Sequence, residues 1–158
     1  MKKFALALTA VFVLSFACLG GGGTPNQVVQ NLFDAIEGGD GDAVVGCLST
    51  EILDGFDEGL EELKADPEGT AAMAVMMGIE ITPEEVADLT PGKAISIILS
   101  SEMMTSEMPD FSTVEIGEAV IDGETATVPV TMDGDTEDIE LVLEDGNWKI
   151  GGEGMNFM

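Results

Sequence analysis

The protein is a chain of 158 residues, long enough for one domain, with 31 Asp and Glu, five Lys and Arg, and a net charge of −26. This charge excludes nucleic acids and other phosphate-rich partners, because their recognition depends on Arg and Lys. The sequence contains no histidine and no tyrosine, two side chains on which general acid–base catalysis often relies.

The N-terminus has the pattern of a lipoprotein signal peptide. Two lysines precede an apolar run that is shorter than the roughly 20 residues needed to span a membrane. The run ends in Leu14-Ser15-Phe16-Ala17-Cys18, which is similar to the lipobox of bacterial and archaeal lipoproteins, where the cysteine is lipidated. We therefore expect a signal peptide at 1–17, a lipidated Cys18 and a flexible glycine-rich tether at 18–23.

Lipidation would anchor the domain to the outer face of the cell membrane, since a diacylglyceryl group supplies the two chains that stable anchoring needs. Two alternatives remain open: simple cleavage near Ala17, which gives a freely secreted protein, and an uncleaved N-terminal helix. An anchored Cys18 leaves Cys47 without a disulfide partner. Cys47 lies among Val44, Val45 and Leu48, so we expect it to be a small buried hydrophobic residue.

Removal of the signal peptide leaves Lys64, Lys93 and Lys149 against all 31 acidic residues. Three interpretations apply: a salt-adapted solvated surface, weak binding of cations, and steering of a basic partner. The acidic residues are scattered through every segment, and this favours the salt-adapted surface.

Helical signals follow one another from residue 24 to residue 104. Thr24-Pro25-Asn26-Gln27 forms a capping box ahead of apolar residues at helical spacing, and Gly38-Gly39 ends this first helix. Asp40 caps a short second helix. Further helices are expected at 51–65 and 71–77, with a break at 66–69. Thr82-Pro83 and Thr90-Pro91 repeat the signal of a cap followed by proline, and they introduce helical stretches at 86–89 and 94–104.

After Pro109 the apolar period becomes alternating, which predicts strands. We expect strands at 112–121, at 125–132, around Ile139 to Leu143, and at 147–150, joined by tight turns that contain glycine. Ala126, Val128, Val130 and Met132 share one face. The sequence thus predicts an α+β domain at 24–151, with helices packed on one face of an antiparallel sheet and a short tail at 152–158.

This order of elements resembles the nuclear transport factor 2-like (NTF2-like) superfamily of cystatin-like cones, and within it a small exported lipoprotein branch of unknown function. The resemblance rests on the first helix, with Thr24, Pro25, Val28, Val29, Phe33 and Ala35, on the Gly39-Asp40 step before 43–48, and on the ending Glu144 to Ile150. It implies a curved sheet wrapped around a long first helix. Other members use the resulting cone to bind small molecules, to catalyse or to dimerise, and residues 51–111 are an additional helical insertion.

Enzymes of this superfamily set a His, Asp or Tyr inside the cone, so a catalytic role here would fall to a carboxylate. Asp34 and Glu37 are the candidates on the first helix, but each directly follows a core residue, and we expect both on the solvent side. Asp133, Asp135 and Glu137 have part of the spacing of a calcium loop, with Glu144 as its last ligand. Asp138 replaces the glycine that such a loop needs, so we expect a solvated hairpin tip and no metal site.

The methionines form the remaining candidate feature. We weigh three interpretations: gap-filling core, which is favoured, an apolar or lipidic pocket, and a Cu(I) site. The residues concerned are Met73, Met76, Met77, Met103, Met104 and Met108. Trp148 is expected to anchor one face of the sheet. A ligand pocket, if present, would be lined by Phe33, Met73, Met76, Met77 and Trp148.

The sequence as a whole predicts a non-enzymatic, lipid-anchored domain without a cofactor, which binds a protein or a small apolar ligand at the cell surface. One alternative is a cone-fold enzyme that uses a buried carboxylate. The other is an envelope accessory subunit that docks another protein. An acidic residue in an enclosed pocket would favour the enzyme, whereas a cone filled by apolar side chains would favour docking.

Overall fold

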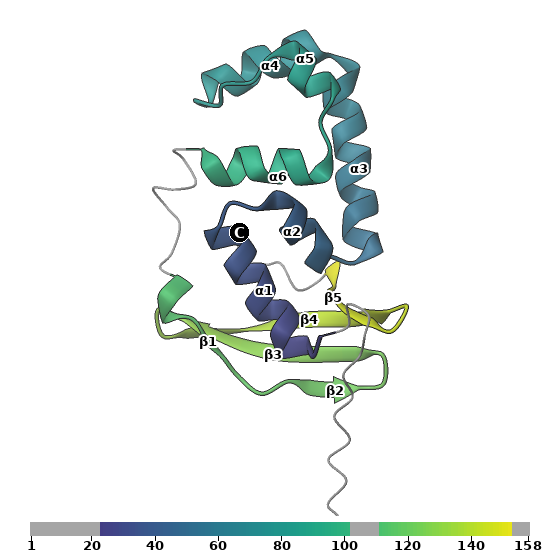
Figure 1. Cartoon of the computed structure of the whole chain (residues 1–158), viewed down its shortest axis with the longest axis vertical. Helices are drawn as coiled ribbons and strands as arrows, with labels where there is room; N and C mark the ends of the chain where they lie inside the picture. Colours follow the sequence, from purple (N-terminus) through teal and green to yellow (C-terminus); the bar gives the residue numbers. More distant parts are fainter. Residues whose placement is uncertain (1–22, 102–110, 153–158) are drawn as a thin grey trace, which may run out of the picture.

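The computed structural model of the protein describes residues 23–101 and 111–152, and within these ranges six α-helices precede an antiparallel sheet (Figure 1). The predicted signal peptide, Cys18, Met103, Met104 and Met108 lie outside the described residues, as do most of the tether and tail. No helix in the described part is both long and apolar enough to cross a membrane.

The first two helices form as their capping signals predict. In α1 (Pro25–Glu37), Thr24 N–H donates to Gln27 Oε1 at 2.9 Å and Gln27 N–H donates to Thr24 Oγ1 at 3.4 Å, which completes the capping box. In α2 (Gly41–Cys47), Ala43 N–H donates to Asp40 Oδ1 at 3.0 Å. Gly39 turns the chain between them with a φ of 66°, a conformation that glycine adopts without strain.

Four more helices, α3 (Thr50–Ala65), α4 (Pro67–Met76), α5 (Pro83–Ala87) and α6 (Pro91–Ser100), form a helical lobe. α4, α5 and α6 lie on the far side of α2 from the sheet, and α3 runs to them from beside β5 (Figure 1). The expected break at 66–69 is shorter than predicted. Asp66 accepts from Gly69 N–H at 3.1 Å, and Pro67 takes the first helical position, so α4 begins at Pro67 and not at Ala71. The predicted end of the last helix at Met104 lies outside the described residues.

The sheet contains β1 (Glu115–Ile116), β2 (Val120–Asp122), β3 (Thr125–Met132), β4 (Asp135–Glu144) and β5 (Asn147–Ile150). All pairings between these strands are antiparallel: β3 lies between β4 on one side and both β1 and β2 on the other, and β5 pairs with β4. The outer edge of β5 is covered in part by a bridge between Leu48 and Ile150.

The prediction of one continuous strand at 112–121 is wrong, because Pro129 interrupts the pairing. Gly117 N–H donates to Pro129 O at 2.7 Å, so the edge of β3 at this point faces the interrupted strand, and proline has no N–H to return. Three residues between Ile116 and Val120 lie opposite two residues of β3, which is a bulge. A Cβ at Gly117 would lie 2.6 Å from Pro129 Cγ, so the bulge requires glycine.

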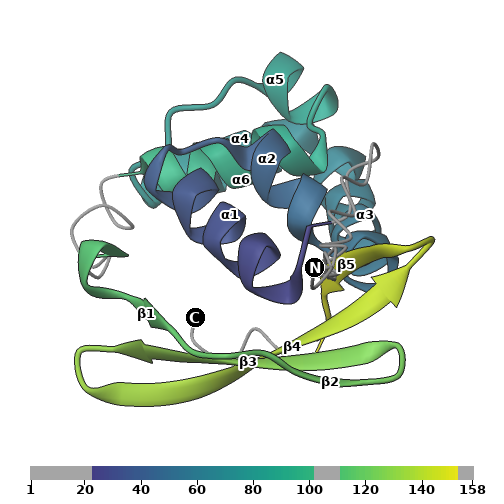
Figure 2. The same ribbon diagram turned by 60° about the horizontal axis from the view of Figure 1, so that its bottom comes forward.

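The core lies between α1 and the concave face of the sheet (Figure 2). Ala126, Val128 and Val130 are buried as predicted, whereas Met132 at the end of β3 is only half-buried. The side chains that fill the cone are aliphatic or aromatic and come mainly from α1, β3, β4 and β5: Val28, Val29, Leu32, Phe33, Ile36, Val128, Ile139, Leu141 and Ile150. A second, smaller core of Leu60, Ala71, Val86 and Leu89 holds the helical lobe together.

Candidate functional site

The C-terminal motif of the resemblance holds the helices on the sheet. Lys149 Nζ donates to Gly46 O in the last turn of α2, where a cation is favourable beside the helix C-terminus. The Glu144 carboxylate accepts from Thr50 N–H at 3.1 Å and from Thr50 Oγ1 at 2.9 Å, at the N-terminus of α3. Ile150 is fully buried and Trp148 packs against the main core. The motif is therefore structural.

A cavity of about 270 Å³ opens at one end of the cone. Its apolar lining is Phe33, Val130, Met132 and Ile139, and Phe33 packs against Phe111 with the ring centroids 5.6 Å apart. Asp135 and Glu137 lie on the same face of β4 as the buried Ile139, so their carboxylates line the mouth together with Asp133. The structure thus brings together Phe33 and the three weak metal candidates, which the sequence did not connect.

In the described structure these three acidic residues are not placed as a group that could hold a metal ion. Each is exposed, and within 23–101 and 111–152 no group of three or more acidic or cysteine side chains is placed to hold a metal ion. Asp133 and Gly134 form the turn between β3 and β4, with φ angles of 54° and 94°. Glu144, the expected last ligand of a calcium loop, is engaged by Thr50.

Asp34 and Glu37 are both exposed, as the sequence predicted. The Asp34 carboxylate accepts from Gln30 Nε2 at 2.8 Å on the outer face of α1. Among the described residues the only buried polar or charged side chains are Ser49 and Ser101. In this part of the chain no carboxylate is therefore buried enough to serve as the raised-pKa base of a cone-fold enzyme.

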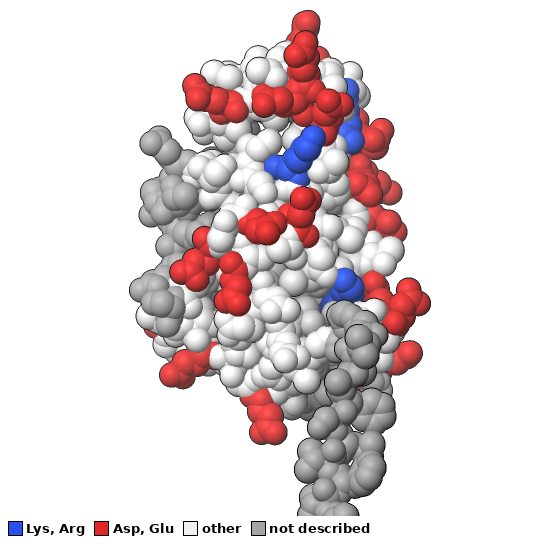
Figure 3. Space-filling model, in the orientation of Figure 1, with Lys and Arg blue, Asp and Glu red and all other residues white. Residues whose placement is uncertain are grey.

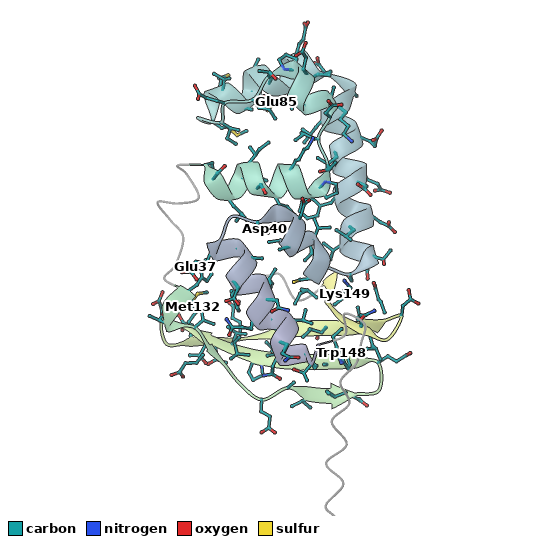
Figure 4. The ribbon with its side chains drawn as sticks, in the orientation of Figure 1. Glu37, Asp40, Glu85, Met132, Trp148 and Lys149 are labelled. Carbon is teal, nitrogen blue, oxygen red and sulfur yellow. The ribbon has the colours of Figure 1, made fainter. Side chains whose placement is uncertain are left out.

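A polar hollow of about 620 Å³ lies where α2, α5 and α6 meet, lined by Asp42, Glu84, Glu85, Asp88 and Lys93 among others. The backbone N–H of Thr82 donates to Glu85 and lowers the pKa of that carboxyl, and the Thr82 hydroxyl adds to the effect. This pairing is the capping box of α5. Figure 4 places Glu85 at the end of the molecule farthest from the sheet. Helix capping thus accounts for the lowered pKa.

The methionines of α4 are on the surface. Met73, Met76 and Met77 are 62%, 88% and 51% exposed, so the core interpretation is wrong for these three. The helix is short and buries only Ala71, which belongs to the second core, and Ala74, so the longer side chains are left outside. Met73 and Met77 instead line a groove of about 170 Å³ against Leu63, Ile79 and Ile98.

This methionine groove offers an occupant almost no polar contact. Thr70 is the one polar side chain among its lining residues, and its hydroxyl already donates to Leu63 O at 2.8 Å. The groove continues along α3 into a shallower hollow of about 620 Å³ whose lining includes Ile52, Phe56 and the shared residues Leu63 and Ile98. We call the two together the α3–α6 groove. None of the side chains that line its second part is polar.

The predicted ligand-pocket residues lie in three separate places. Phe33 is at the open end of the cone, whereas Trp148 packs at the opposite end of the sheet from Met132, the neighbour of Phe33 in that cavity (Figure 4). Met73 and Met77 are in the helical lobe. Sequence reasoning missed Ile98 and Leu63. A signal for Ile98 was present, since α6 is apolar on both faces, with Ile95 and Leu99 toward the main core and Ile97 toward the second.

No family model matches the chain, and no curated protein matches its sequence. A comparison with solved structures finds a Campylobacter jejuni protein whose name suggests an NTF2-like transpeptidase. The two are 14% identical, and the match covers 80% of this chain and 97% of that one with a TM-score of 0.38.

The arrangement of helices and strands agrees with the arrangement that the resemblance implied. The long first helix lies across the concave face of a curved antiparallel sheet (Figure 2), and four further helices occupy the insertion. The protein thus has a cone-like α+β fold in which the cone is filled and the helical lobe carries the exposed apolar groove.

Proposed function

We propose that the protein is a non-enzymatic binding domain, held at the outer face of the cell membrane through a lipidated Cys18, which uses the α3–α6 groove to bind an apolar partner. The observation that carries the proposal is the exposure of large apolar side chains on the helical lobe: Leu63, Met73, Val75, Met76, Met77 and Ile98. Exposed apolar patches that are rimmed by polar residues mark interaction sites.

The high negative charge of the protein strengthens the argument that these exposed apolar side chains bind a partner. Figure 3 shows acidic side chains over the end of the molecule formed by α4 and α5, and along the edge formed by α3. A chain with a net charge of −26 has ample polar residues with which to cover its surface. Apolar residues that stay exposed beside such a surface are therefore expected to have a partner.

The filled cone supports binding over catalysis. Aliphatic side chains occupy the space between α1 and the sheet, and the chain has no histidine or tyrosine. A cone-fold enzyme would need a carboxylate shielded from water, and the described residues contain no buried one. The docking role, which the sequence kept as an alternative, is compatible with the same groove.

Native mass spectrometry of the full chain purified from its own membrane tests both parts of the proposal. We expect a mature chain that begins at an acylated Cys18 and retains a bound apolar molecule or protein. Cys18→Ser should lose the acyl mass. The double variant Met73→Gln/Met77→Gln should lose the bound species.

The matched control is Val120→Gln/Ile121→Gln, which makes the same kind of change at side chains that are 69% and 55% exposed on β2. This control should keep the bound species. A wild-type protein recovered without any bound mass, or equal retention by both double variants, would contradict binding through the methionine groove.

A further inference from the structure

Two glycines on α3 form an unexplained feature of the groove. Gly55 and Gly59 are one turn apart on the groove face of α3, and each costs about 1 kcal/mol of helix stability relative to alanine. A Cβ at either position would meet nothing within 4 Å. Packing within the described chain therefore does not require glycine at either position, and the two glycines leave room for another chain to approach the α3 backbone.

A row of carboxylates borders these glycines. Glu51, Glu58 and Glu62 follow one another at helical spacing on the solvent side of Gly55 and Gly59, and all three are exposed. The other edge of the groove is α6, which contributes Ala94 and Ile98. A negative potential thus runs along one side of an apolar floor, and the occupant that fits it has positive charges beside an apolar stripe.

The lack of polar lining limits which backbone conformation the occupant of the groove can have. Ile52, Phe56, Leu63 and Ile98 present carbon atoms, and the backbone groups of α3 and α6 are bonded within their own helices. An extended segment would lose hydrogen bonds to water without regaining them in the groove, whereas a helix brings its own. From Ile52 to Leu63 the floor is about 17 Å long at the helical rise, or three turns of a bound helix.

We propose, building on the binding function above, that the α3–α6 groove docks an amphipathic helix of a partner protein whose apolar stripe is flanked by lysine or arginine. A second copy of this chain is a poor occupant, because a copy that begins at Cys18 has only Lys64, Lys93 and Lys149 against 31 acidic residues. α3 lies at the edge of the molecule (Figure 1), and its residues line the groove together with Ala94 and Ile98 of α6.

The test uses the full chain in nanodiscs of zwitterionic lipid, with empty nanodiscs as the blank. Fluorescence anisotropy measures the binding of a labelled helical peptide of leucine, alanine and lysine. Two comparison peptides carry glutamate in place of lysine, or a central proline that prevents a continuous helix. We expect the lysine peptide to bind, and each comparison peptide to bind about tenfold more weakly or less.

Larger side chains at Gly55 and Gly59 should block binding of the peptide without damage to the fold. Gly55→Leu and Gly59→Leu place a side chain in open space and raise helix propensity, so their melting temperatures should equal or exceed that of the wild type. We expect each to weaken binding of the lysine peptide by about tenfold. Gly46→Leu on α2, where a Cβ also meets nothing within 4 Å, is the matched control and should bind normally.

A separate variant tests the role of the carboxylates of Glu51, Glu58 and Glu62. Glu51→Gln/Glu58→Gln/Glu62→Gln should weaken the lysine peptide and flatten its salt dependence, whereas Asp133→Asn/Asp135→Asn/Glu137→Gln at the open end of the cone should do neither. Unchanged binding by Gly59→Leu, or equal binding of the lysine and glutamate peptides, would overturn the proposal.

A labelled long-chain alcohol tests whether the occupant of the groove is instead an uncharged lipid chain. If it binds in a manner that Gly59→Leu abolishes while no peptide binds, the occupant is a lipid chain. In that case the inference of a basic helix fails and the proposed apolar binding function stands. If neither the alcohol nor any peptide binds, both fail.

Discussion

Lys149 joins the sheet to the helical layer by a single long-range bond. Its amine donates to Gly46 O, a partner 103 residues away in the sequence, and thereby holds the C-terminus of α2 against β5. We expect Lys149→Met to lower the free energy of unfolding by about 1–2 kcal/mol, since the bond is to a charged donor. Urea unfolding followed by circular dichroism measures this loss.

Lys93→Met is the control for that variant, because it removes the same charge from an exposed lysine whose bond to Asp88 O, at 3.3 Å, is local. It should change stability by less than about 0.5 kcal/mol. Equal effects of the two variants would mean that net charge, and not the tie to α2, determines the result.

Because the Cys47 thiol is buried, we expect its contribution to the free energy of unfolding to change at alkaline pH. Burial raises the pKa of its thiol, and the nearby Lys149 opposes this only in part. The folded protein therefore keeps the thiol proton at pH values where the unfolded chain has lost it. Its contribution to stability is complete below the ordinary thiol pKa of about 8.5, and is lost as pH rises from there through the raised pKa of the folded state.

The difference in unfolding free energy between the wild type and Cys47→Ala should accordingly shrink as pH rises above about 8.5. Denaturant unfolding at several pH values checks this. The native thiol should also react slowly with thiol reagents, as befits a residue that is 8% exposed. A difference that grows with pH would contradict the buried neutral thiol.

At the scale of elements, the helical lobe is joined to the cone by the crossing of α2 and α6. Gly41 N–H donates to Ser96 Oγ at 2.8 Å, and a Cβ at Gly41 would lie 2.0 Å from Gly92 O and 2.6 Å from Ser96 N. Backbone atoms cannot yield as a flexible side chain can. Glycine at position 41 is therefore what allows the two helices to pack at this distance.

Gly41→Ala should consequently destabilise the protein by about 1–3 kcal/mol, the usual cost of overpacking. Thermal unfolding provides the measurement, and hydrogen exchange should show earlier opening of α6 than in the wild type. Gly46→Ala, in the same helix but with open space around it, should be neutral or slightly stabilising. A Gly41→Ala protein as stable as the wild type would show that the crossing relaxes at no cost.

The wrong prediction of one strand at 112–121 has its cause in the neighbouring strand β3. Alternating apolar residues predicted pairing through 112–121, and that pattern does not include the edge of β3 that this strand meets. Pro129 presents its donor-free side to Gly117, so the ladder breaks into β1 and β2. A proline in one strand thus decided the length of another, which is information that neither segment contains alone.

For the whole molecule, the net charge of −26 predicts a dependence of stability on salt. Self-repulsion of a compact acidic chain weakens as the screening length falls from about 10 Å at 0.1 M salt to about 3 Å at 1 M. We expect the melting temperature to rise by several degrees over this range in sodium chloride. Calorimetry of the full chain measures it.

Millimolar calcium serves as the comparison for the cation-binding interpretation. At equal ionic strength it should add nothing beyond screening, because the described acidic residues form no metal cluster. A melting temperature that stays constant with sodium chloride would contradict the salt-adapted surface. A large rise at low calcium would instead favour specific cation binding.

The sequence by itself determined the starts of α1 and α2, the turns of the sheet and the α+β class, because these depend on near neighbours. Thr24 with Gln27, Asp40 with Ala43, and the glycine turns each act within a few residues. Only the tertiary structure decided which residues hold the elements together and which form the candidate binding groove. The partners of Glu144 and Lys149 are 94 and 103 residues away, so their roles as ties could not be seen from spacing. The exposure of Met73 and Met77 likewise depends on where α3, α5 and α6 lie around α4, since an apolar side chain is buried or left to a partner according to what covers it.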